Sequence, residues 1–298
     1  MTEILTLHRR FRDYSFAFKG NTPRTVRWFH DSMRSFVTHS GIEKLDEATR
    51  GQIEEWLFRG KNERSWSAKT IRNHLQALSS FFEWCVKEEF LPENPVKKIS
   101  RPKLPKRIPK HLTKEQALNL IEWAWNFNYS YKFERSRAAA IIATFIFSGV
   151  RLQELVNLKL QEIDLENKTL FVKSGKGEKD RIVPLCPRLI EILKAYLKDR
   201  NRLKKNCPYF FTAMREDNRM GDKVIPRLVQ RLREKSGIYF YPHMLRHTFA
   251  TLMLEGGCDL FSLSKMMGHS DIKTTTIYLS ATAGHLQEQI AKHPLNDA

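Results

Sequence analysis

Apolar residues recur at steps of three and four through the first hundred positions, which is the spacing of helices that bury one face. Four such segments begin near residues 4, 22, 46 and 67. The fourth has the clearest pattern, because Ser67 is a favourable N-cap and the apolar side chains after it share one face. Those side chains are Ile71, Leu75, Leu78, Phe82 and Val86. The pattern predicts a small helical bundle over residues 1–100.

A proline-rich stretch, residues 101–112, interrupts this periodicity. Its three prolines remove backbone donors and prevent a continuous helix, so we predict a linker between two domains. The stretch also holds five Lys or Arg residues and no acid. Both a solvated connector and a basic strap along DNA phosphates fit this composition. The candidate phosphate contacts are Arg101, Lys103, Lys106 and Arg107.

After the linker, residues 113–298 mix helical segments with short β-prone runs. The runs 168–172 and 181–185 flank a glycine-bearing turn, which predicts a hairpin with Lys176 near its tip. An apolar helix over 138–148 supplies the core of this second domain, and later helical patterns follow it. They cover 188–205, 223–235, 243–255, 259–267, 271–281 and 283–292. The predicted fold is mainly α-helical, with a small antiparallel β-hairpin in the C-terminal lobe.

The net charge of the chain limits the classes of molecule that it is expected to bind. Among 298 residues, 51 Lys and Arg against 33 Asp and Glu leave a net charge of +18 and a pI near 9.8. Such a basic chain favours nucleic acid. An anionic membrane surface is the competitor, but the longest mainly apolar run, 138–150, is too short to span a bilayer. No secretory signal is visible near the N-terminus, so we expect a cytoplasmic protein.

The residues that commonly bind metals are arranged without a metal-binding motif. The cysteines are scattered at positions 85, 186, 207 and 258, with no Cys-x-x-Cys pair. His243 and His247 have the spacing of a His-Glu-x-x-His zinc site, but Met244 stands where the Glu belongs. We therefore expect reduced thiols, no metal and no other cofactor.

Polar residues line a second face of the predicted helix that begins at Ser67. They are Lys69, Arg72, Asn73 and Gln76. Residues at these three- and four-residue steps lie together and present donors that suit a DNA groove. A solvated helix surface explains the same pattern and is the commoner case.

A histidine and an arginine share one edge of the helix predicted over 243–255. Pro242 suits its first turn, and the three-residue step from His243 to Arg246 places the two side chains beside the apolar face. An imidazole next to a guanidinium suits phosphate binding, although such pairs are usually ordinary surface residues.

Two further segments carry candidate chemical groups. In the first, Gly149 ends the apolar helix and presents Arg151, three residues before Glu154. A surface ion pair that contributes under about 1 kcal/mol is the plain alternative for these two. In the second, Gly268 ends a helix, His269 lies in the turn, and Tyr278 follows two turns later. Alone, that tyrosine would be assigned to the core.

Taken together, in order and spacing, these motifs resemble those of the tyrosine site-specific recombinases, in particular the Xer-type chromosome-dimer resolvases. The resemblance covers nearly the full length, including the segment Phe90-Leu-Pro-Glu-Asn-Pro before the linker. It implies a two-domain DNA clamp, with a helical core-binding domain and a catalytic domain. It also implies roles for seven residues: the catalytic Arg151, Lys176, His243, Arg246 and His269, the nucleophile Tyr278, and the supporting Glu154. Lys173 and Lys179 remain the alternatives to Lys176 in the hairpin.

The resemblance further implies transesterification through a 3′-phosphotyrosine, without metal or ATP. The partners would be double-stranded DNA with paired inverted sites and further copies of the chain, as a dimer on each site and a tetramer in the synapse. The segment after Tyr278 would dock on a neighbouring protomer or pack on its own domain. Whether the task is dimer resolution or integration, and whether a second recombinase or a DNA translocase takes part, is open at this stage.

Two other functions compete with recombination. A type IB topoisomerase would use the same chemistry but relax DNA without synapsis. A non-catalytic architectural DNA-binding protein would fit the net charge and the helical first domain alone. That last reading leaves the matching order of the six candidate catalytic residues unexplained.

Overall fold

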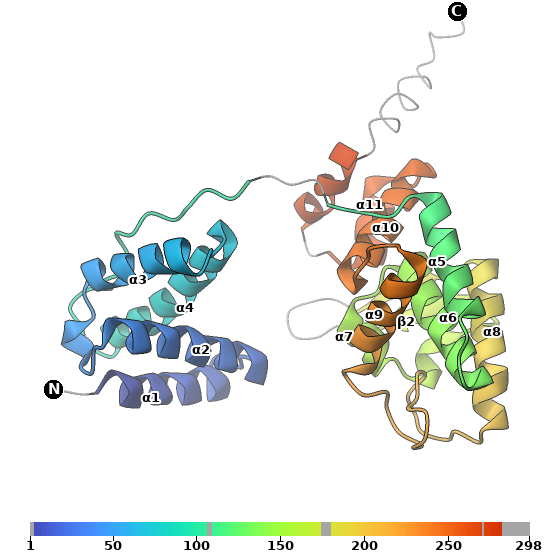
Figure 1. Ribbon diagram of the computed structural model, residues 1–298, viewed down its shortest axis with the longest axis horizontal. Helices are drawn as coiled ribbons and strands as arrows, with labels where there is room; N and C mark the ends of the chain where they lie inside the picture. The colour runs from blue at the N-terminus through green and yellow to red at the C-terminus, as the bar shows by residue number, and fades with distance from the viewer. Residues whose placement is uncertain (1–2, 106–108, 174–179, 270, 282–298) are drawn as a thin grey trace, which may run out of the picture. The chain divides into compact units, whose positions relative to one another are not determined.

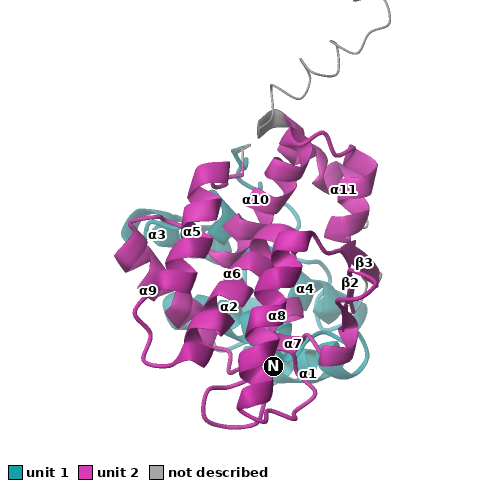
Figure 2. Cartoon of the chain, turned by 90° about the vertical axis from the view of Figure 1, so that its right-hand side faces the viewer, with its two compact units in different colours: residues 1–106 teal, residues 107–298 magenta. Residues whose placement is uncertain are grey.

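The computed structural model describes residues 3–105, 109–173, 180–269 and 271–281. The chain divides into two compact units, residues 1–106 (unit 1) and residues 107–298 (unit 2), which are coloured separately in Figure 2. Each unit has its own hydrophobic core.

Within its described residues, unit 1 is a bundle of four α-helices (Figure 1). The helices are α1 (Ile4–Ala17), α2 (Pro23–Ser40), α3 (Arg50–Glu63) and α4 (Ala68–Lys87), with a short 3₁₀ helix η1 (Leu45–Glu47) before α3. The predicted cap at Ser67 is confirmed, because its side chain accepts a hydrogen bond from the backbone N–H of Thr70. The helices enclose a core rich in aromatic rings, which includes Phe11, Phe36, Trp56, Phe81 and Phe82.

In unit 2, α6 (Lys132–Ser148) is the central helix and is buried on nearly all sides from Ser136 to Ile146. It packs against α5 (Lys114–Asn126), α8 (Pro187–Arg202) and α10 (Pro242–Glu255), and Figure 1 shows it between α5 and α8. The predicted core helix therefore begins six residues earlier than its apolar run. The other helices in the described part of unit 2 are α7 (Leu152–Asn157), η2 (Leu160–Glu162), α9 (Val224–Ser236), α11 (Leu260–Met267), η3 (Ile272–Thr274) and η4 (Thr276–Ala281).

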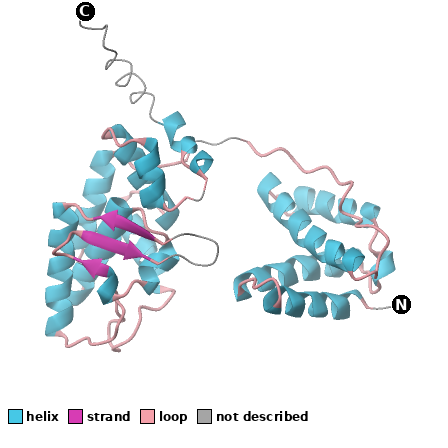
Figure 3. Cartoon of the chain, turned by 180° about the vertical axis from the view of Figure 1, so that it is seen from behind, coloured by secondary structure: helices cyan, strands magenta, loops and turns pink. Residues whose placement is uncertain are grey.

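The described β-structure is a small antiparallel sheet in unit 2 (Figure 3). Strands β2 (Thr169–Val172) and β3 (Arg181–Pro184) are the predicted pair, and β1 (Ile163–Asp164) adds a third strand beside β2. The prediction of a mainly helical protein with a small antiparallel sheet is confirmed. Lys176 and its alternative Lys179 lie outside the described residues.

The helical pattern at 271–281 forms two 3₁₀ helices, η3 and η4, rather than one α-helix. Asp271 accepts a hydrogen bond from the backbone N–H of Lys273 at the start of η3, and Thr275 separates the two helices. The tighter 3₁₀ turn is common in short segments of this kind. The helix predicted over 283–292 lies outside the described residues.

Candidate active site

The guanidinium of Arg246 lies at the centre of the site and joins three segments of unit 2. Its side chain projects from α10, and the residue is only 4% exposed. Nη1 donates to the carbonyl of Gly149 at 2.5 Å, and Nη2 donates to the carbonyl of Met267 at 2.6 Å and contacts His269 Nε2 at 3.2 Å. Burial, followed by the charges of Arg151 and Arg181, lowers the pKa of Arg246 to about 10. The group therefore stays cationic at neutral pH.

Glu154 binds two further guanidiniums, those of Arg151 and Arg181. Oε1 accepts from Arg151 Nη1 at 3.0 Å and from Arg181 Nη1 at 2.9 Å, while Oε2 accepts from Arg181 Nη2 at 2.7 Å. The backbone N–H of Arg151 also donates to Oε2, at 2.6 Å, as the cap of α7. Burial alone would raise the pKa of Glu154, but its hydrogen bonds with Arg181 and Arg151 and their charges lower it to about 2. The carboxylate is therefore always ionised near neutrality.

Arg181 was missed by the sequence analysis. It starts β3 with a side chain that is 5% exposed, and its Nε donates to the carbonyl of Met266 at 2.8 Å. It thus ties the sheet to the end of α11 and, through Glu154, to Arg151. The alternation Arg181-Ile182-Val183, with its first and third residues buried, is the signal that could have revealed an inward-facing arginine.

His269 follows α11 in the turn that Gly268 opens with a φ of +66°. Because Arg246 Nη2 donates to Nε2, the ring proton is assigned to Nδ1, which lies 2.8 Å from Thr275 Oγ1. Burial, followed by the charges of Arg246 and Arg151, lowers the pKa of His269 to about 4. The ring is neutral at pH 7.

Tyr278, in η4, is 2% exposed and packs among apolar residues of α10 and α11. Its hydroxyl lies 2.8 Å from His247 Nδ1, on the same helix as Arg246. Burial raises the pKa of Tyr278, while the charges of Arg246 and Arg151 lower it in part. His247 is a second site residue that the sequence did not reveal, because its spacing from His243 pointed only to a metal site.

His243 is exposed in the first turn of α10. Burial, followed by the charges of Arg246 and Arg151, lowers its pKa. The structure therefore gathers six predicted residues into one region of unit 2: Arg151, Glu154, His243, Arg246, His269 and Tyr278. Within the described residues, no group of three His, Cys, Asp or Glu side chains is arranged to hold a metal ion.

The predicted DNA-contacting residues lie apart from this cluster in sequence, in unit 1 and the linker. On α4, Lys69, Asn73 and Gln76 are exposed and Arg72 is partly exposed. Arg101 and Lys103 are exposed as well, whereas Lys106 and Arg107 lie outside the described residues.

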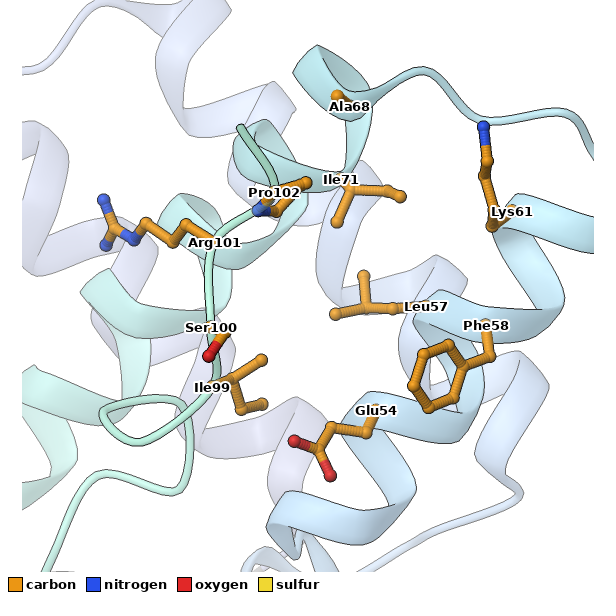
Figure 4. A pocket seen from close by; sticks show the side chains of 10 residues that line it. All are labelled: Glu54, Leu57, Phe58, Lys61, Ala68, Ile71, Ile99, Ser100, Arg101 and Pro102. Atoms are coloured by element: carbon orange, nitrogen blue, oxygen red, sulfur yellow. The ribbon is translucent and has the colours of Figure 1, made fainter. Parts of the chain in front are cut away.

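A pocket of about 440 Å³ lies in unit 1 between α3, α4 and the chain that leads into the linker (Figure 4). Its lining is mostly apolar and includes Leu57, Phe58 and Ile71. Arg101 also lines it, with its side chain directed away from the cavity in Figure 4. None of the six clustered residues of unit 2 borders it.

Comparison with known proteins identifies the family of the chain. The phage integrase family matches residues 110–285, and the N-terminal SAM-like domain of phage integrases matches residues 7–91. The chain belongs to the phage integrase family of tyrosine recombinases. It is accordingly a site-specific recombinase of the Xer-like type, an enzyme that cuts and rejoins DNA.

Relatives of this recombinase match it over almost the full length. Tyrosine recombinase XerA of Thermococcus onnurineus is 32% identical over 293 residues, which cover 97% of this chain and 94% of that protein. Tyrosine recombinase XerC of Thermodesulfovibrio yellowstonii is 34% identical over 290 residues, with 93% of both chains covered. The predicted family is therefore confirmed.

Solved structures support the fold of the recombinase. A crystal structure of XerA recombinase is 28% identical, with a TM-score of 0.54 over 97% of this chain and 98% of that one. A structure of XerH bound to palindromic difH substrate has a TM-score of 0.76 over 97% of this chain and 84% of that one, at 23% identity. No helix among the described residues is long and apolar enough to cross a bilayer.

Proposed function

We propose that this recombinase cleaves a DNA strand by attack of Tyr278 Oη on a backbone phosphorus, forming a 3′-phosphotyrosine and releasing a 5′-hydroxyl. The observation that carries the proposal is the position of the phenol, whose Oη lies 2.8 Å from His247 Nδ1 on the helix that also carries the buried Arg246. The positive charges of Arg246 and Arg151 also lower the pKa of Tyr278 in part. The bond energy is kept in the protein–DNA ester, so no ATP is required.

Two guanidiniums suit the charge that develops in this reaction. Attack on phosphorus builds negative charge on two non-bridging oxygens, and a guanidinium fork bonds such oxygens while remaining charged. The bonds of Arg246 to two carbonyls and His269 use three of its five N–H groups and fix its orientation. The side chain of Arg151 is 26% exposed, which leaves it accessible to a phosphate. These groups supply the positive charge that a metal ion supplies in other phosphoryl-transfer enzymes.

Four further residues complete the proposed reaction. His243, exposed one turn before Arg246 on α10, would bond a phosphate oxygen, and His269 would hold Arg246 toward the same phosphate through the contact of its Nε2 with Nη2. Lys176 is assigned from the sequence as the donor that protonates the leaving 5′-oxygen, as a departing alkoxide requires a proton. Glu154 is a positioning residue, because it holds the guanidinium of Arg151.

For DNA binding we propose that unit 1 and the linker contact one duplex. Lys69, Arg72, Asn73 and Gln76 lie at the steps that form one face of α4, and Arg101 and Lys103 continue the positive charge into the linker. Lys106 and Arg107 extend the same basic run. The charged groups would position the protein on phosphates, and the amides would face base edges.

The proposed substrate is a pair of inverted binding sites, each bound by a dimer, with a tetramer in the synapse. Among similar structures, XerH is described bound to a palindromic substrate and λ integrase as a dimer bound to a core site. The task proposed is Xer-like resolution or integration, in which a second recombinase or a DNA translocase would be a further partner.

The decisive test uses a nicked duplex bearing a binding site, since diffusion of the released fragment traps the cleaved state. We expect a denaturation-resistant protein–DNA adduct with the wild-type chain, formed equally well with a chelator present, and no adduct with Tyr278→Phe. An adduct that persists in Tyr278→Phe would assign the nucleophile elsewhere. Two-site substrates then separate recombined products from merely relaxed DNA.

A further inference from the structure

His247 contacts the reacting atom of the proposed mechanism. Its Nδ1 lies 2.8 Å from Tyr278 Oη, and the two ring centroids are 5.5 Å apart with an interplanar angle of 51°. The histidine is half-buried, and the tyrosine is almost fully so. A hydrogen bond between two such groups is fixed by packing, so the contact has a defined geometry.

The helix α10 explains why an imidazole is available at this point. His243, Arg246 and His247 are three and four residues apart or adjacent, so they lie along one edge of the helix. The same edge thus presents the guanidinium proposed to bind phosphate and an imidazole directed at the phenol. His269, in contrast, has both ring nitrogens engaged, one by Arg246 and one by Thr275.

We propose that His247 is a catalytic residue that accepts the proton of Tyr278 at Nδ1 as the phenolic oxygen attacks phosphorus. The inference rests on the proposed function, in which Tyr278 is the nucleophile. The O–H bond of Tyr278 breaks as its proton passes to Nδ1, and a bond forms between Oη and phosphorus. The bond from phosphorus to the 5′-oxygen breaks, and that oxygen leaves as a hydroxyl with a proton from Lys176. Rejoining runs in reverse, with His247 returning the proton.

The charged groups around His247 suit a base whose pKa depends on bound DNA. It is faced by His243 and Arg246 from α10, by His111 from the segment before α5, and by His269 and Tyr278 from the C-terminal part of unit 2. Burial, followed by the charges of His243, Arg246 and His111, lowers the pKa of His247 to about 4, so the free ring is neutral at pH 7. A bound phosphodiester brings a negative charge among these groups and raises that pKa, which strengthens the base when DNA is present.

The test measures single-turnover adduct formation on a nicked duplex, at saturating protein, from about pH 6 to about pH 9. The probe is a duplex that the wild-type chain selects from a pool with two randomised inverted arms. The variants are His247→Asn, which keeps an acceptor oxygen near the position of Nδ1 but takes no proton, and His247→Ala. His74→Asn is the matched control, because His74 is another half-buried histidine whose Nδ1 contacts a hydroxyl, that of Ser32 at 3.2 Å.

We expect both His247 variants to bind DNA like the wild type but to form adduct at least about 100-fold more slowly near neutrality. The deficit narrows as the pH rises, because hydroxide then removes the phenolic proton. His74→Asn should cleave at the wild-type rate. If His247→Asn alone recovers the wild-type rate, the residue only positions Tyr278, and if either variant cleaves faster than the wild type, the contact restrains the tyrosine. Both results overturn the proposal.

A second substrate, with sulfur in place of the 5′-bridging oxygen, separates the two proton transfers. A thiol is far more acidic than an alcohol, so its thiolate leaves without a proton. We expect the sulfur substrate to restore the rate of adduct formation in Lys176→Ala. Adduct formation by His247→Asn should stay slow on the same substrate. Restoration of His247→Asn would place His247 at the leaving group and contradict the inference. An adduct with Tyr278→Phe would instead defeat the proposed nucleophile, so the two failures are distinguishable.

Discussion

At the scale of single residues, the site depends on the way one carboxylate is shared. Glu154 accepts hydrogen bonds from both Arg151 and Arg181, and its side chain is only 10% exposed. The three-residue spacing of Arg151 and Glu154 alone fits an ordinary surface ion pair. Burial and the second guanidinium change that assessment, because a buried ionised group that loses its partner is left uncompensated.

Replacing Glu154 with Gln tests this at the residue scale. The pKa of Glu154 is about 2 in the folded chain against an ordinary 4.5. Its contribution to stability is therefore complete above about pH 4.5 and is lost as the pH falls toward 2. We expect Glu154→Gln to lower the free energy of unfolding by about 3 kcal/mol at pH 7, with the difference shrinking below about pH 4.

Urea titrations at several pH values measure this difference. Glu55→Gln is the control, since Glu55 pairs with Arg59 on the exposed face of α3 and should contribute under about 1 kcal/mol. A difference for Glu154→Gln that stays constant down to pH 2 would contradict the assigned role of the carboxylate.

At the scale of elements, the site is assembled where helix ends and the sheet edge meet. Gly149 ends α6 and Gly268 ends α11, both with positive φ, and the carbonyls of Gly149 and Met267 accept from Arg246. At Gly268 the backbone also approaches Arg181 closely, because a Cβ built there would lie 2.8 Å from Arg181 Cδ. A side chain at this turn would therefore push the guanidinium from Glu154 and Met266.

The variant Gly268→Ala tests this contact between α11 and β3. Gly237→Ala is the matched control, since Gly237 has a φ of +69° and its added Cβ would meet nothing within 4 Å. Both substitutions carry the strain of positive φ, about 1 kcal/mol. We expect Gly268→Ala to cost about 2 kcal/mol more than the control and to slow adduct formation. Equal thermal stability and equal cleavage rates for the two variants would show that Arg181 adapts freely.

At the scale of the whole molecule, the net charge of +18 bears on DNA binding. Contacts between basic side chains and phosphates release counterions, so DNA affinity falls as the salt concentration rises. The slope of log affinity against log salt is proportional to the number of these contacts. The linker is the segment where basic residues occur without acids, and Arg101 and Lys103 are exposed in the part that the structure describes.

Removing these two linker charges should change the salt dependence in a defined way. We expect the double variant Arg101→Ala, Lys103→Ala to reduce the slope of log affinity against log salt by about 1.8, at about 0.9 for each phosphate contact. Titrations of a labelled duplex at several salt concentrations measure the slope. Replacing Lys194 and Lys198, which are exposed on α8, should leave it unchanged. If the linker variant and the α8 variant reduce the slope equally, the linker charges contribute only a general attraction to DNA and no specific phosphate contact.

Local periodicity and motif order were enough to predict much of this protein. The bundle of unit 1, the cap at Ser67 and the β2–β3 pair follow from side-chain spacing, because a helix or strand buries whichever face is apolar. The order of the candidate catalytic residues also indicated the family. Each of these residues belongs to a local motif, such as a helix end or a turn, that can be recognised from the sequence.

What the sequence left undecided are contacts between segments far apart in the chain. Arg181 meets Glu154 across 27 residues, and His247 meets Tyr278 across 31. The short strand β1 and the 3₁₀ form of 271–281 are of the same kind, because neighbouring segments rather than intrinsic preference determine them. The amino-acid sequence by itself determined which candidate groups for phosphate chemistry the recombinase has and the order in which they follow one another. Only the tertiary structure decided which histidine meets the phenol and which arginine holds the carboxylate, because packing sets distances that spacing along the chain does not.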